Sequence, residues 1–164
     1  MRIDEQTKYA DFQPIEDAIA DDEKQKIKAA AEQYFKPCYT LTIDEFFGLL
    51  NGDYSLLGSM AEPSVLQVYW LKRFAEFCEE FTNACARMNI KDPEKEHLHT
   101  GCVSIEPQEA MLIFTREYFG LPSFFAAGER TIGEYLTARK DKFNEAVVRH
   151  NFEAEQKRKF KMKK

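Results

Sequence analysis

Glycine and proline are scarce in this chain of 164 residues, which has seven glycines and six prolines. Barrels and sandwiches built from many tight turns need more of both, so the composition argues against an all-β fold. Apolar runs are also short. None approaches the roughly 20 residues that cross a bilayer, and the first residues, MRIDEQTKYADF, lack the apolar core of a signal peptide. We therefore expect a protein that is made and kept in a cytoplasm.

Sequence motifs of catalysis and nucleotide binding are missing as well. The chain contains no GxSxG, GxGxxG or GxxxxGK[ST], and no CxxC or HExxH. No cysteine or serine has a recognisable base partner. Without a secretory signal, the four cysteines are interpreted as buried free thiols rather than as a disulfide framework. We expect no enzymatic activity and no cofactor.

Aromatic residues are abundant, with fourteen Phe, seven Tyr and one Trp. The segment 63–88 carries large apolar residues at steps of four, three, four, four and three, which places them on one stripe of a helix. We expect this helix to be the one around which the chain packs. The stripe consists of Trp70, Phe74, Phe77, Phe81, Cys85 and Met88.

Four more helices are predicted from their end signals. One follows Pro14 and stops before Pro37, and another spans 42–51 between a Thr42/Glu45 capping box and Asn51-Gly52, which should supply left-handed residues. The others are a helix over 107–119 that ends at Gly120 and a last helix that starts with a Thr131/Glu134 capping box and runs from Ile132 past Phe152. The helix starts TIDEFF and TIGEYL look alike, which we interpret as a shared start pattern because nothing around them repeats.

These elements predict an all-α single domain, a bundle of about five helices with a long loop before the fourth. We expect a loose N-terminal arm over 1–13, a helical domain over 14–152 and a basic C-terminal extension over 153–164 that frays or docks elsewhere. Residues 139–164 contain ten basic and four acidic residues, whereas residues 1–138 contain 13 basic and 24 acidic ones. An acidic body with a basic end favours self-association or docking on an oppositely charged partner.

Two groups of residues are candidate sites. His97, His99 and Cys102 could supply three of four tetrahedral zinc ligands, although exposed loop histidines are the alternative interpretation, because this spacing is not that of a zinc finger. Apolar residues crowded into short turns should form an exposed interface patch or, alternatively, cap the ends of the bundle. With the basic end, the predicted interface residues are Phe46, Phe47, Tyr54, Leu57, Phe124, Phe125, Lys157, Arg158 and Lys159.

Two segments, LTIDEFFGLLNGDYSLL at 41–57 and YFGLPSFFAAGERTIGEYLTARKDKFNE at 118–145, resemble small helical proteins encoded among phage structural and assembly genes. The resemblance implies a tail-assembly chaperone or virion-assembly protein that binds other chains and performs no chemistry, in the host cytoplasm.

The leading hypothesis is therefore a protein-interaction or assembly factor that self-associates or binds a protein partner, with no membrane and no identified small-molecule substrate. A metal-binding module or metal-dependent enzyme at the histidine loop is the first alternative. A nucleic-acid accessory protein that uses the basic end is the second, although the acidic body would repel phosphate.

Overall fold

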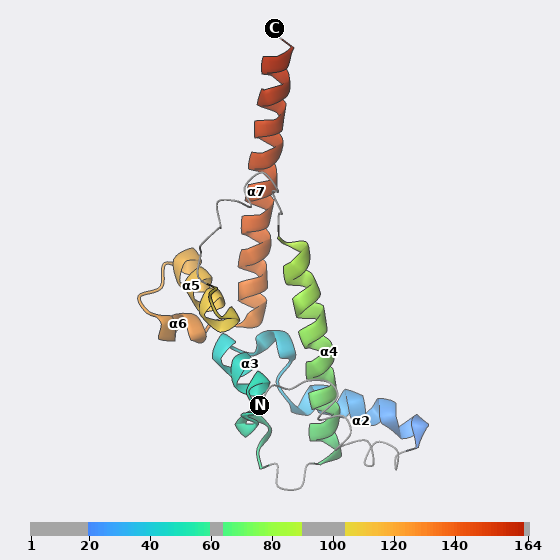
Figure 1. Ribbon diagram of the computed structural model, residues 1–164. Coiled ribbons are helices and arrows are strands. Elements are labelled where there is room, and N and C mark those ends of the chain that lie inside the picture. Colours follow the sequence, from blue (N-terminus) through green and yellow to red (C-terminus); the bar gives the residue numbers. More distant parts are fainter. Residues whose placement is uncertain (1–19, 60–63, 90–103, 163–164) are drawn as a thin grey trace.

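The computed structural model describes residues 20–59, 64–89 and 104–162, and within these ranges every regular element is a helix. Two single 3-10 turns, η1 (Cys38–Thr40) and η2 (Ser55–Leu57), connect longer helices. The predicted all-α class is confirmed (Figure 1). The α-helices are α2 (Asp21–Tyr34), α3 (Ile43–Leu50), α4 (Val65–Arg87), α5 (Pro107–Phe119), α6 (Phe124–Gly128) and α7 (Ile132–Lys161).

Helix α4 carries the aromatic residues at the centre of the core, as their spacing predicts. It starts with a capping box in which Ser64 N–H donates to Gln67 Oε1 at 2.6 Å and Gln67 N–H donates to Ser64 Oγ at 3.3 Å. Trp70, Phe74 and Phe77 are buried, with 2%, 1% and 7% of their surface exposed. The stripe therefore forms the centre of the core, and the later positions of α4 pack on it partly buried.

Helix α2 packs across the first half of α4 (Figure 1). Trp70 stacks on Phe74 with ring centroids 5.7 Å apart, and its Nε1–H donates to the Lys36 carbonyl at 3.0 Å. This bond fixes the chain where it leaves α2. The helix begins at Asp21, because Ala20 is extended (φ −61°, ψ 143°), and the predicted start at Pro14 lies outside the described residues.

Helix α3 brings Phe46 into the aromatic core of α4. Its ring centroid lies 5.6 Å from that of Phe74 and 5.2 Å from that of Phe81. The end of α3 differs from the prediction: Asn51 is right-handed (φ −88°, ψ 0°), and only Gly52, with φ 93°, is left-handed. One residue in that conformation is enough to turn the chain.

Helix α7 is the longest element, and its second half stands away from the other described helices (Figure 1). Ile132, Tyr135 and Ala138 are buried in the body. The helix then continues unbroken through residue 152 to Lys161, so the predicted extension is helical over 153–161. The reason is local: the sequence EAEQKRK at 153–159 consists of strong helix formers.

Candidate protein-interaction surfaces

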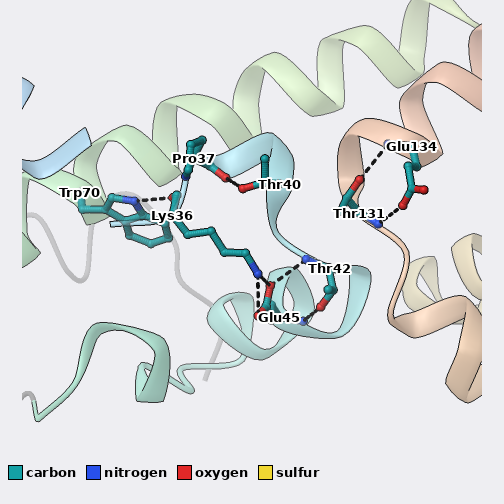
Figure 2. A network of polar contacts seen from close by, with 8 residues as sticks. All are labelled: Lys36, Pro37, Thr40, Thr42, Glu45, Trp70, Thr131 and Glu134. Carbon is teal, nitrogen blue, oxygen red and sulfur yellow. Dashed lines mark hydrogen bonds and ion pairs between the residues drawn. The ribbon is translucent and has the colours of Figure 1, made fainter. Parts of the chain in front are cut away.

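The two similar helix starts lie side by side, although they are far apart in the sequence (Figure 2). Ile43 N–H donates to the Arg130 carbonyl at 2.9 Å, and Ile132 N–H donates to the Leu41 carbonyl at 2.8 Å. Thr42 and Thr131, the two N-cap residues, thereby form an isolated antiparallel bridge. The bridge sets α3 and the start of α7 in fixed register.

Both predicted capping boxes are present at this junction (Figure 2). Glu45 N–H donates to Thr42 Oγ1, and Glu134 N–H donates to Thr131 Oγ1, each at 3.1 Å. In return the backbone N–H groups of Thr42 and Thr131 each donate to the glutamate at 2.8 Å. Four N–H groups at the helix ends are therefore satisfied without water.

Each of these glutamates also holds a cation. Lys36 Nζ lies 2.8 Å from Glu45 Oε2, and Arg130 Nη1 lies 2.9 Å from Glu134 Oε1. Burial opposes ionisation of Glu45, but the Lys36 ammonium and the Thr42 N–H outweigh it and lower the pKa of that carboxyl. The Thr131 N–H is the main cause that lowers the pKa of Glu134. These charges stabilise the junction, and all their partners lie within this chain.

The predicted interface residues separate into two groups. Phe46 and Leu57 belong to the core, with only 3% and 5% exposed, so the prediction that they lie in an exposed patch is wrong. Phe47 and Tyr54 are half-buried and pack against the same core. The physical reason is the Thr42–Thr131 bridge, which sets α3 against α5 and α6 while Phe46 packs on the aromatic face of α4. Phe46 and Leu57 are therefore core residues, and Phe47 and Tyr54 pack against them.

Phe124 and Phe125 lie on the surface, 45% and 73% exposed. They begin α6, whose N-cap residue Ser123 accepts a bond from Ala126 N–H at 3.2 Å. The Arg116 guanidinium lies 4.5 Å from the centre of the Phe124 ring. We call Arg116, Phe124 and Phe125 the α6 corner. Arginine over aromatic rings is the residue combination that protein interfaces favour.

Lys157, Arg158 and Lys159 are exposed on the last turns of α7. We call residues 148–161 the α7 extension. Contact of these cations with nucleic acid stays a prediction. The extension also carries apolar side chains that were not chosen as interface residues from the sequence, and the signal that could have found them is their helical spacing. These are Val148, Phe152 and Phe160, which are 68%, 60% and 75% exposed.

The point where α7 leaves the body is held by polar and aromatic contacts. Arg139 Nη2 donates to Asn89 Oδ1 at 3.1 Å, directly after α4, and its guanidinium lies 5.4 Å from the centre of the Phe114 ring on α5. Tyr118 on α5 donates its hydroxyl to Asp141 Oδ2 at 2.8 Å. The part of α7 that precedes the extension is thus held by α5 and by Asn89, which follows α4.

The cysteines at the three described positions are free thiols, as predicted; Cys38 is buried, whereas Cys78 and Cys85 are half-buried where burial was expected. Burial raises the pKa of Cys38 to about 11 and that of Cys78 to about 12. At neutral pH both stay protonated, and a protonated thiol is a poor nucleophile and a poor metal ligand. These two thiols act as small apolar side chains in the core.

The proposed metal ligands His97, His99 and Cys102 lie outside the described residues. Over 20–59, 64–89 and 104–162, three or more His, Cys, Asp or Glu side chains are nowhere placed to hold a metal ion together. Among those same residues, no helix combines the length and the apolarity needed to cross a membrane. The chain matches no family model, no curated protein and no solved structure.

Proposed function

We propose that this chain is a non-enzymatic protein-binding factor that acts through the α7 extension and the α6 corner. The observation that carries the proposal is the exposure of Val148, Phe152 and Phe160 on a helix that continues beyond the body. A helical segment as short as the α7 extension is marginally stable in water by itself, because tertiary packing normally supplies most of the stability of a helix. Burial against another protein would stabilise it by about 25 cal/mol for each Å² of apolar surface covered.

The α6 corner supports the same function at a second place. Phe125 projects from a helix of five residues, and Phe124 is partly covered by Arg116 from α5. Rigid aromatic side chains lose little entropy when a partner covers them, and Arg and aromatic residues supply most interface energy. A partner that presents apolar side chains and a carboxylate would fit this corner.

Assembly of a phage tail or virion is the specific form of the proposal that the resemblance of segments 41–57 and 118–145 suggests. What supports it is that these segments supply α3, η2, α6 and the first half of α7, and that the Thr42–Thr131 bridge joins them. An assembly chaperone needs a stable body and an exposed binding element, and the body and the α7 extension fit these two roles.

Site-specific photo-cross-linking in cells that express the chain tests the proposal. A photoreactive residue introduced at Phe125 or Phe152 should give discrete protein adducts, identified by mass spectrometry. Gln25, which is exposed on α2, is the control position and should give none. The proposal is refuted if Phe125 and Phe152 give no adducts, or only those that Gln25 gives.

A further inference from the structure

One face of α7 carries a regular stripe of exposed residues. Successive members are separated by four, three, four, three, four and three residues, which is the repeat of 3.5 that keeps a seam straight between two supercoiled helices. Every member is exposed. This outer stripe consists of Asp141, Glu145, Val148, Phe152, Glu155, Lys159 and Met162.

The outer stripe points away from the body. Tyr135 contacts Phe81 of α4, and Arg139 contacts Asn89 and Phe114, so these residues define the inner side of α7. At about 100° per residue, Val148 and Phe152 lie roughly opposite that side. Asp141 at the start of the stripe still contacts Tyr118 of α5, and packing of the body leaves the stripe open from Glu145 onward.

The charged members of the stripe lie on both sides of its apolar middle. Asp141 and Glu145 precede Val148 and Phe152, and the acidic Glu155 and the basic Lys159 follow them. Two stripes aligned in parallel would place like charges together, Asp141 against Asp141 and Lys159 against Lys159. An antiparallel alignment instead places Asp141 of one chain opposite Lys159 of the other.

We propose that the outer stripe binds the outer stripe of a second copy of this chain, antiparallel, with Val148 of each copy packed on Phe152 of the other. In this alignment the helices overlap from residue 141 to 159, about 28 Å at 1.5 Å per residue. The inference rests on the proposed function and names its partner. This one arrangement covers the exposed side chains of Val148 and Phe152 and places Asp141 opposite Lys159.

The same alignment places Glu145 of each copy opposite Glu155 of the other, so this unfavourable pair occurs twice in the dimer. Each of these carboxylates already has a lysine of its own helix beside it. Lys142 Nζ lies 2.8 Å from Glu145, and Lys159 Nζ contacts Glu155 at 2.6 Å. These lysines reduce the repulsion, so the pair weakens the dimer without preventing it.

Analytical ultracentrifugation of the full chain over a concentration series tests the inference. The mass should rise from the monomer value of 19.1 kDa towards twice that value. Phe152→Glu should raise the dissociation constant more than about tenfold, because it places a charge at the centre of the seam. Phe160→Glu is the matched control: Phe160 is 75% exposed on the same helix but lies off the stripe, so its dissociation constant should stay unchanged.

A charge exchange tests the antiparallel direction. Lys159→Glu alone should weaken the dimer, and Asp141→Lys combined with Lys159→Glu should restore much of the affinity, because opposite charges face each other again. In a parallel dimer the combined variant would gain nothing. Asp141 also accepts the Tyr118 hydroxyl bond, so circular dichroism and Trp70 fluorescence must show that the body of the combined variant is intact.

A dimer that Phe152→Glu leaves unchanged would overturn the inference, and so would a monomer at every concentration. Failure of the proposed function can be told apart from these results. A monomer whose residue 152 cross-links to other proteins refutes self-pairing alone, whereas a monomer without adducts at residues 125 and 152 refutes both.

Discussion

Phe46→Ala tests whether the residue is a core residue or an interface anchor. The side chain is 3% exposed, and its ring meets those of Phe47, Phe74, Phe77 and Phe81 at centroid distances between 5.2 and 6.4 Å. Truncation removes these contacts and leaves a cavity that the surrounding rings are too rigid to fill. The expected loss in the free energy of unfolding is about 3–5 kcal/mol, the range for buried Phe→Ala.

Urea unfolding provides the measurement, followed both by far-UV circular dichroism and by fluorescence of Trp70, the single tryptophan. Phe125→Ala is the matched control, because the side chain is 73% exposed and its loss should change stability by less than about 0.5 kcal/mol. If Phe46→Ala costs under about 1 kcal/mol, or costs no more than Phe125→Ala, the core assignment of Phe46 is refuted.

Three other predictions concern the junction, a helix end and the thiols. The pKa values of Glu45 and Glu134 are lowered in the folded state, so the stability that their ionised forms contribute is complete above the unfolded value of about 4.3 and is lost as the pH falls through the folded values. The urea midpoint should fall less steeply between neutral and acidic pH in the Glu45→Gln/Glu134→Gln variant, which keeps both capping boxes, than in the unchanged protein. Equal pH dependence of the two midpoints would show that these carboxylates do not cause the loss of stability. Gly120→Ala should destabilise the fold by about 1 kcal/mol and lower the thermal midpoint, because residue 120 ends α5 in the left-handed conformation, at φ 63°, which alanine disfavours. An unchanged thermal midpoint would exclude that conformation. Cys38 and Cys78 should react with a thiol reagent only after denaturant is added, since burial raises both pKa values; fast reaction of the native protein at pH 7 would contradict their burial.

The features that could be predicted from the sequence are those that depend only on interactions between residues close together in the chain. The capping boxes at Thr42 and Thr131 join residues three positions apart, and Gly120 ends its helix by its own conformation. The apolar spacing of α4 likewise needs no knowledge of neighbours. The interface residues could not be chosen correctly in the same way, because apolar side chains such as Phe46 and Phe125 look alike until their helices are placed.

The helical class, most of the helix ends and the core stripe of α4 follow from local sequence, since hydrogen bonds and periodicity within one segment fix them. The remaining features arise only when the helices pack together. Tertiary structure joined Thr42 to Thr131, buried Phe46 and Leu57, left Phe124 and Phe125 outside, and turned one face of α7 away from the body. These outcomes depend on contacts between segments far apart in the chain, and no short stretch of sequence contains both partners.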